Sequence, residues 1–249
     1  MISKTHTKYI QSLQHKKFRD EYGEFIAEGP KVVTELLACG KFNCRELYAV
    51  NTWLDAHAAL PKKYTATTFI EIKEFELEKI SAMATPNNVL AVFEKRKQHA
   101  DIRFEGKITL LLDTIQDPGN FGTIIRNADW FGIESVICSR DCADMYNPKV
   151  VQSTMGSLGR VNILYDNPGE WIQKNSAVKI YAATLHGTAV SRLKGIREGI
   201  IIIGNEARGI SEELMQLVNE KITIPKKGEA ESLNAAVASG IILSHIREI

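Results

Sequence analysis

The amino-acid sequence predicts an α/β fold whose larger, C-terminal part is a mostly parallel sheet with helices on both faces. The first observation is the alternation of short apolar runs with helical segments from about residue 108 onward. The second is that runs such as residues 200–203 are wholly apolar and lack the polar alternation of a half-exposed strand. Because ligands of such sheets bind outside the carboxyl ends of the strands, we expect the functional site there.

A smaller α/β unit precedes this sheet. Pro30 and Gly40 bracket a helix in the usual order, with proline just inside its start and glycine just after its end. The charged, non-periodic stretch 95–99 is expected to be a linker, which predicts domains at 1–98 and 99–249. The expected elements are strands at 24–29, 45–50, 65–72 and 89–95 and helices at 30–40, 53–59 and 73–82.

The elements of the second unit follow from the same patterns. Its apolar runs are short enough for strands, and the segments between several of them have helical periodicity or helix-capping residues. We expect strands at 108–113, 135–140, 162–166, 179–185, 199–206 and 221–225 and helices at 120–131, 147–156, 211–219 and 232–247.

The composition is that of an ordinary globular protein. The chain has 249 residues, of which 44% are hydrophobic and 24% charged, and its net charge is +1. No apolar run reaches the ~18 residues of a membrane span, and the N-terminus lacks the apolar core of a secretory signal, so we expect a cytoplasmic location. The cysteines form no CxxC pair and have no histidines at metal-ligand spacing, so we expect free thiols and no metal. They are Cys39, Cys44, Cys138 and Cys142.

Basic residues without any acid fill the N-terminal stretch 1–19. Such a stretch suits a phosphate-facing arm or an ordinary solvated surface, and composition alone favours the solvated surface. The basic residues are Lys4, Lys8, Lys16, Lys17 and Arg19.

The first of three motifs follows the strand that ends at Asp113. The turn from Asp117 leads into a helix that Asn120 can cap. Arg126 lies almost two turns into this helix, where it can point at a phosphate or a nucleophile. A capped helix whose arginine pairs with a surface acid is the commoner outcome of such a segment.

The second motif runs from Gly204 to Ser211, after the apolar strand. Gly204 and Gly209 permit a tight turn and close approach to a ligand, and the main-chain amides there can bond an adenine or a ribose. A strand–turn–helix connector without a ligand has a similar pattern.

The third motif is a basic loop that opens into a helix of small side chains, within residues 222–240. Small side chains permit the close approach of another backbone. Tight packing alone does not explain Ser232 and Asn234 at the end of the loop.

In this order and spacing, the three motifs resemble the SpoU/TrmH branch of the SPOUT RNA methyltransferases. The resemblance covers the whole second unit, and residues 1–98 look like the RNA substrate-binding domain common in the family. Residues 154–157 also match a segment that the family has before its third strand. The matches are Asn120, Gly122 and Arg126 in the first motif, Gly204, Asn205, Glu206 and Gly209 in the second, and Ser232, Leu233 and Asn234 in the third.

The resemblance implies a SPOUT domain with a deep trefoil knot, an exception to the rule that protein chains are not knotted. It implies a homodimer in which Arg126 lies near the cofactor pocket of the partner subunit. It also implies a methyl transfer from S-adenosylmethionine to a ribose 2′-hydroxyl of structured RNA, with ribosomal RNA favoured over transfer RNA and no metal required.

The resemblance assigns roles to individual residues. The predicted catalytic residues are Asn120, Arg126, Glu206, Ser232 and Asn234. The predicted cofactor contacts are Thr184, Leu185, Gly187, Gly204, Asn205, Ile224 and Leu233. The predicted RNA contacts of the first unit are Lys16 and Arg19. Lys226 and Lys227 depart from the family, because relatives often carry an apolar residue there; they are predicted as further RNA contacts that add phosphate affinity or shift the substrate preference.

Two other functions compete with this one. A catalytically silent RNA-binding or ribosome-assembly protein can use the same scaffold, and cofactor binding discriminates it from an enzyme. A nucleotide-dependent enzyme can use residues 119–122 as a phosphate loop, but neither GxGxxG nor GxxxxGK[ST] occurs in the sequence.

Overall fold

The computed structural model describes residues 2–97, 102, 106–174, 178–193 and 195–246. Contacts divide the chain into two compact units, and the first combines residues 1–97 with residues 144–159. The second combines residues 98–143 with residues 160–249. No helix among the described residues is long and apolar enough to cross a membrane.

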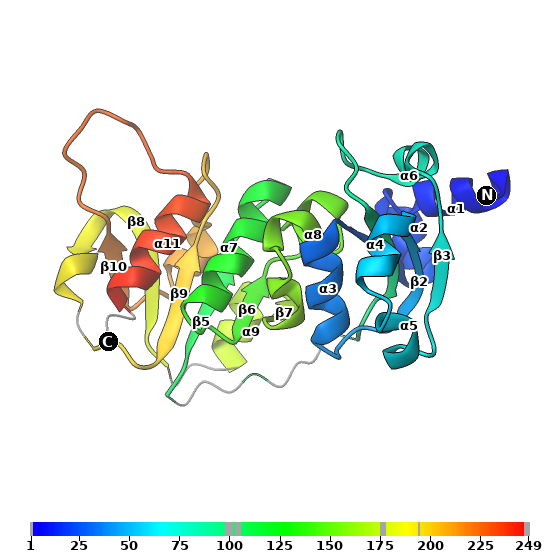
Figure 1. Ribbon diagram of the computed structural model, residues 1–249. Helices are drawn as coiled ribbons and strands as arrows, with labels where there is room; N and C mark the ends of the chain where they lie inside the picture. Colours follow the sequence, from blue (N-terminus) through cyan, green and yellow to red (C-terminus); the bar gives the residue numbers. More distant parts are fainter. Residues whose placement is uncertain (1, 98–101, 103–105, 175–177, 194, 247–249) are drawn as a thin grey trace. The chain divides into compact units, whose positions relative to one another are not determined.

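The first unit contains a four-stranded mixed sheet in the order β1-β4-β2-β3. Strands β2 and β3 of this sheet are labelled in Figure 1. Strand β4 is antiparallel to β1 and β2, whereas β2 and β3 are parallel. Its strands are β1 (Glu24–Glu28), β2 (Cys44–Ala49), β3 (Thr68–Glu71) and β4 (Val89–Glu94). Its helices are α1 (Lys4–Ser12), α2 (Lys16–Tyr22), α3 (Pro30–Ala38), α4 (Asn51–Ala56), α5 (Leu60–Lys63), α6 (Glu74–Ile80) and α8 (Pro148–Thr154), with a 3-10 turn at Ser157–Gly159.

The N-terminal basic stretch folds into helices α1 and α2 rather than an extended arm. Ile10 and Leu13 are fully buried, and they pack with Tyr48 and Leu90 of the sheet and with Leu77 of α6. The basic side chains of this stretch are therefore mounted on packed helices.

The segment 144–159 packs against α3 of the first unit. A Cβ atom added to Gly159 would lie 2.8 Å from Sγ of Cys39, and one added to Gly156 would lie 2.5 Å from Cβ of Glu35. These glycines therefore let the segment approach the helix closely.

The second unit contains a six-stranded sheet in the order β10-β8-β9-β5-β6-β7, and all its pairings are parallel. The predicted α/β class with a parallel sheet is confirmed. The strands are β5 (Ile108–Leu112), β6 (Ser135–Cys138), β7 (Asn162–Tyr165), β8 (Ile180–Ala189), β9 (Gly199–Ile203) and β10 (Glu220–Thr223). The helices are α7 (Pro118–Trp130), α9 (Pro168–Lys174), α10 (Glu212–Met215) and α11 (Ala235–Ile246), with a 3-10 turn at Val190–Arg192.

Both faces of this sheet are covered, which explains why β5 and β9 are buried along their whole length. Leu111 and Ile202 pack with Trp171 of α9 and Leu214 of α10. Because side chains alternate along a strand, the neighbouring residues face the opposite side. Helices α7 and α11 pack against each other, and they lie side by side in front of the strands in Figure 1.

Several predicted elements differ from the observed ones. The predicted helix 211–219 ends at Met215, because Asn219 already bonds the main chain of Ile180 and leads into β10. Helix α11 begins at Ala235, not at residue 232. Helix α9 was not predicted, although the Oδ1 atom of Asn167 accepts hydrogen bonds from the amides of its first turn.

Candidate functional site

The loop that follows β9 is hydrogen-bonded to the residues just after β5. The Asn205 side chain donates to the carbonyl of Thr114 at 2.9 Å and accepts from the amides of Ala207 and Arg208. The carboxylate of Asp113 accepts from the Ser211 amide at 2.8 Å. The second motif is therefore held at the carboxyl edge of the parallel sheet, where the sequence predicts the site.

Gly204 allows this loop to fold back on itself. Asn205 and Gly209 exchange main-chain hydrogen bonds of 2.9 Å, and a Cβ atom on Gly204 would lie 2.4 Å from the carbonyl of Gly209. No residue with a side chain fits this position without displacing the loop.

Replacing Gly204 by alanine is expected to weaken S-adenosylmethionine binding, because the displaced loop loses its main-chain geometry. Overpacking of this kind costs about 1–3 kcal/mol, which corresponds to roughly 5- to 150-fold in affinity. Gly228→Ala is the matched control, since an added Cβ atom meets nothing within 4 Å there. Calorimetric titration with the cofactor measures both variants. Unchanged affinity in Gly204→Ala would remove this loop from the cofactor site.

A line of hydrogen bonds joins the three motifs. Nδ2 of Asn120 donates to Oε1 of Glu206 at 2.6 Å, and Nδ2 of Asn234 donates to Oδ1 of Asn120 at 2.9 Å. Asn234 also caps α11, because its Oδ1 accepts from the amides of Ala236 and Val237. Asn120 is not the cap of α7 as predicted, since Asp117 occupies that position and accepts from the Asn120 amide.

Arg126 and Ser232 stand outside this line. Arg126 lies six residues after Asn120 on α7, so it points about 120° away around the helix axis. It is exposed, and its guanidinium makes no hydrogen bond or ion pair with any residue that the structure describes. Ser232 is also exposed, in the loop before α11. A single subunit therefore brings together three of the five predicted catalytic residues.

Three of the predicted cofactor residues, Thr184, Leu185 and Gly187, lie in a bulge of β8. Residues 183–187 are inserted between the positions of β8 that pair with Lys221 and Ile222 of β10. Thr184 donates to the carbonyl of His186, and Thr223 donates to that of Leu185. The bulge places the loop at residue 185 beside the end of β10.

The residues near this bulge fit a flat, hydrogen-bonding group such as the adenosine of S-adenosylmethionine. Leu185 is a large apolar side chain that is 63% exposed, which an apolar ligand surface would cover. Leu233, in the third motif, is 46% exposed. Gly187 packs directly on the main chain, because a Cβ atom there would lie 2.4 Å from the carbonyl oxygen of Lys221. Ile224 is half-buried just after β10. The Asn205 side chain bonds the carbonyl of Thr114 and so fixes the loop after β9.

Asp113 and Thr114 shape the site but were not predicted as site residues. Their signal in the sequence is a carboxylate at the end of a mostly apolar strand, the position where such sheets bind ligands. Thr114 has a positive φ of 58°, a strained conformation for a β-branched residue, and its carbonyl accepts from Asn205.

The cysteines nearest this edge of the sheet are Cys138 and Cys142, and both are buried. Burial raises the pKa of the Cys138 thiol well above its ordinary value, so this thiol is neutral at pH 7. All four cysteines are free thiols. No group of three or more potential metal ligands occurs within the described part of the chain.

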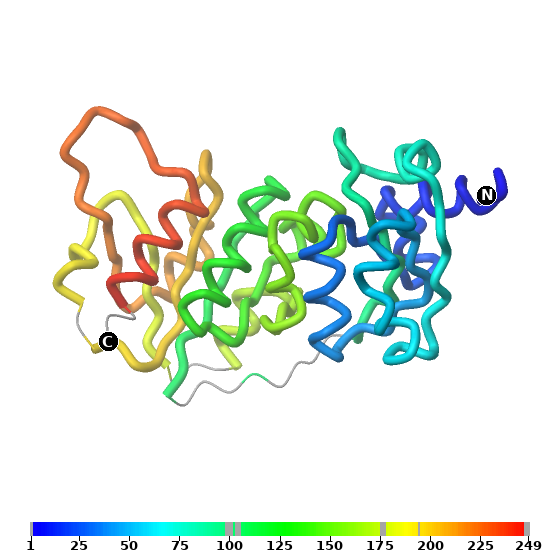
Figure 2. The backbone as a smooth tube through the Cα atoms, viewed as in Figure 1, coloured from blue at the N-terminus to red at the C-terminus, as the bar shows by residue number. Residues whose placement is uncertain are grey.

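Three of the four predicted RNA contacts are exposed lysines, and the fourth is a buried arginine. Lys226 and Lys227 are exposed on residues 224–234, which Figure 2 shows as a long open loop between β10 and α11. Lys16 is exposed on α2 and pairs with Asp20 at 3.5 Å.

Arg19 requires a correction. It is 1% exposed, and its guanidinium donates to Asp144 at 2.7 Å and to the carbonyls of Leu13 and Gln14. The guanidinium is therefore committed to the interior of the first unit and is not an RNA contact.

The fold and the site define a class of protein, namely an α/β protein whose ligand site lies at the carboxyl edge of a parallel sheet. The SpoU rRNA Methylase family matches residues 107–244, and the MRM3-like substrate binding domain matches residues 4–91. The chain belongs to the SpoU rRNA methylase family. It is an S-adenosylmethionine-dependent RNA methyltransferase.

Similar proteins agree with this assignment. A solved TrmH-family protein from Porphyromonas gingivalis is 36% identical, with 98% of both chains covered and a TM-score of 0.87. An AdoMet-bound rRNA methyltransferase from Sinorhizobium meliloti is 31% identical, with 98% of this chain and 95% of that chain covered and a TM-score of 0.86. The 23S rRNA guanosine 2′-O-methyltransferase RlmP of Bacillus subtilis is 28% identical over 240 residues, which cover 95% of this chain and 94% of the relative.

Proposed function

We propose that this chain transfers the methyl group of S-adenosylmethionine to a ribose 2′-hydroxyl of ribosomal RNA. The observation that carries the proposal is the hydrogen-bonded line of Glu206, Asn120 and Asn234 at the carboxyl edge of the sheet. This line unites the three motifs in a member of a family of RNA methylases. The similarity to a 23S rRNA 2′-O-methyltransferase supports the ribose and ribosomal RNA in particular.

The cofactor supplies a methyl group on a sulfonium, which is already a strong electrophile. In this proposal the bulge of β8, the loop after β9 and the residues after β10 hold the cofactor. The residues are Thr184, Leu185, Gly187, Gly204, Asn205, Ile224 and Leu233.

The acceptor hydroxyl needs alignment and the loss of a proton. Asn120, Glu206 and Asn234 orient the ribose and the loop before α11, and Ser232 adds a hydroxyl there. Arg126 is a poor general base because its guanidinium stays protonated. It therefore binds the target phosphate and polarises the 2′-hydroxyl, and the substrate phosphate accepts the proton.

A homodimer in the cytoplasm completes the proposal. Arg126 points away from the hydrogen-bonded line of its own subunit, and it serves the cofactor pocket of the partner. Trp130 and Val237, on α7 and α11, are 81% and 51% exposed and suit a subunit interface. In each subunit, residues 1–98 form the RNA substrate-binding domain and residues 99–249 form a SPOUT domain with a deep trefoil knot.

The test is transfer of label from radioactive S-adenosylmethionine to separated ribosomal and transfer RNA from a strain that lacks the protein. A 2′-O-methyl group blocks alkaline cleavage of the next phosphodiester, so we expect label in an alkali-resistant dinucleotide of ribosomal RNA. Label in the mononucleotides that alkali releases would contradict ribose methylation. Absence of cofactor binding would favour the catalytically silent RNA-binding protein.

Replacing Lys226 and Lys227 together by alanine is expected to weaken RNA binding uniformly across sequences. The dependence of log affinity on log salt should lose about 0.7–0.9 of slope for each phosphate contact removed. Cofactor affinity should not change. The control is Lys174→Ala, which removes an exposed lysine that pairs with Glu170 on α9. Titration of RNA at several salt concentrations checks the result, and an unchanged slope would exclude these lysines as phosphate contacts.

A further inference from the structure

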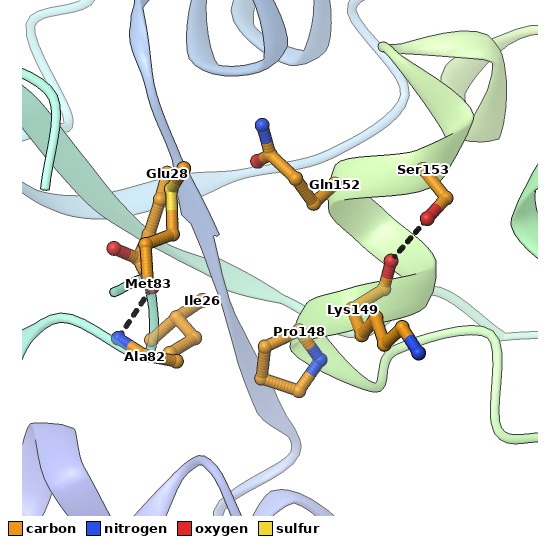
Figure 3. A pocket seen from close by; sticks show the side chains of 8 residues that line it. All are labelled: Ile26, Glu28, Ala82, Met83, Pro148, Lys149, Gln152 and Ser153. Atoms are coloured by element: carbon orange, nitrogen blue, oxygen red, sulfur yellow. Dashed lines mark hydrogen bonds between the residues drawn. The ribbon is translucent and has the colours of Figure 1, made fainter. Parts of the chain in front are cut away.

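The first unit holds a cavity that the methyl-transfer site does not use (Figure 3). Strand β1, the loop after α6 and helix α8 line it, and its volume is about 240 Å³. Pockets for drug-sized molecules measure about 300–1,000 Å³, so this cavity suits a single small ring system. Ala82 and Lys149 line it and are exposed, so the cavity reaches solvent.

Apolar side chains form two of its walls. Ile26 and Met83 lie on one side, and Pro148 lies opposite Ile26 at the start of α8 (Figure 3). Apolar walls facing each other across a narrow space suit the two faces of a planar ring.

The cavity contains acceptor atoms that have room for further hydrogen-bond donors. Oε1 of Gln152 is buried and has no hydrogen-bond partner among the residues that the structure describes. Glu28 is 5% exposed, and its carboxylate accepts from the Ser81 hydroxyl and from the Ala82 amide at 2.8 Å. Each carboxylate oxygen has two lone pairs, so the Glu28 carboxylate can accept a further hydrogen bond. Burial raises the pKa of the Glu28 carboxyl, and a donating ligand would stabilise its charged form.

We propose that this cavity binds one unpaired guanine base of the RNA substrate; the proposal rests on the proposed function in that the chain acts on RNA. Oε1 of Gln152 accepts from the imino N–H of the base, and its Nε2 donates to the adjacent carbonyl. Glu28 accepts from the 2-amino group, and the apolar walls cover the ring. Proteins read RNA sequence in this way, on bases that are splayed out of single-stranded segments.

Glu28 distinguishes guanine from the other bases. The Gln152 amide can pair with any of the four, because it carries both a donor and an acceptor. Where guanine offers its 2-amino group to Glu28, adenine has a C–H, and cytosine and uracil have a carbonyl oxygen. Guanine is therefore expected to bind most tightly, with adenine, cytosine and uracil all below it.

Fluorescence anisotropy with the full chain and labelled pentanucleotides tests this order. The probes carry one central guanine, uracil, cytosine or adenine in an adenine background. Guanine is expected to bind about tenfold tighter than adenine, the effect of one or two hydrogen bonds. Glu28→Met, which keeps a similar volume without the carboxylate, should abolish this preference and leave the affinity for the all-adenine probe unchanged. Glu78→Met makes the same change at an exposed position and should retain the preference.

Equal affinities for all probes in the unmodified chain would overturn the proposal, as would failure to bind any probe or a guanine preference that survives in Glu28→Met. Thermal unfolding of Glu28→Met checks that the variant is folded. Methyl transfer to ribosomal RNA, measured on the same preparation, separates the two proposals. Transfer without a guanine preference overturns only the cavity, and a guanine preference without transfer overturns only the proposed reaction.

Discussion

Replacing Arg126 by alanine is expected to reduce methyl transfer about 10²–10³-fold or more, the usual effect of removing one preorganised donor from a reacting group. The affinity for S-adenosylmethionine should stay within about twofold, because the predicted cofactor contacts lie on other segments of the chain. The variant is expected to fold normally, because Arg126 is exposed and has no structural partner among the described residues. Its removal therefore deletes a charge without breaking a packed contact.

Single-turnover transfer and calorimetric cofactor titration check this pair of expectations. Arg140→Ala is the control, since it removes another exposed arginine of the same unit. Loss of cofactor affinity in Arg126→Ala, together with loss of transfer, would assign Arg126 to cofactor binding instead of to the acceptor.

Mixing two inactive variants tests whether Arg126 acts across a dimer. Arg126→Ala and Asn120→Ala are each expected to be inactive. In a refolded mixture, half the dimers are mixed, and each mixed dimer has one site with both native residues. Transfer should therefore recover to about one quarter of the unmodified rate. A mixture that stays inactive while dimers exchange would place Arg126 and Asn120 in the same subunit's site.

The strands of the second unit were predictable because their signal is local. Wholly apolar runs such as β9 identify buried parallel strands, and both faces of β9 are indeed covered. Helix α9 was missed because the Asn167–Pro168 start signal is followed by only a short segment between two strands. The α2 helix and its packing were missed because the sequence of residues 16–22 is largely charged, and its burial depends on partners far along the chain.

In the candidate site, too, features with a local sequence signal were predictable, and contacts between distant residues were not. The motif residues were found by their spacing, but the bonds that unite them join residues 86 and 114 positions apart, which no local pattern reveals. The direction of Arg126 could be derived from helical periodicity once α7 was assigned. The burial of Arg19 could not be derived, because its partner Asp144 lies 125 positions away.

Replacing Arg19 by alanine is expected to destabilise the first unit by about 3–5 kcal/mol, the usual cost of breaking a buried ion pair by removing one partner. The Arg19 and Asp144 side chains are 2% and 14% exposed, so the remaining carboxylate and the carbonyls of Leu13 and Gln14 lose their donor where water replaces it poorly. Urea denaturation measures the change.

Lys16→Ala separates stability from RNA contact. Lys16 is a 68% exposed side chain that pairs with Asp20 across one turn of α2, so its removal should cost less than about 0.5 kcal/mol. If Arg19→Ala were as stable as Lys16→Ala and lost RNA affinity, the guanidinium would have to leave the interior to reach the substrate. The expected result is the reverse: Arg19 holds residues 144–159 against the N-terminal helices, and the exposed Lys16 can exchange its pairing with Asp20 for a phosphate.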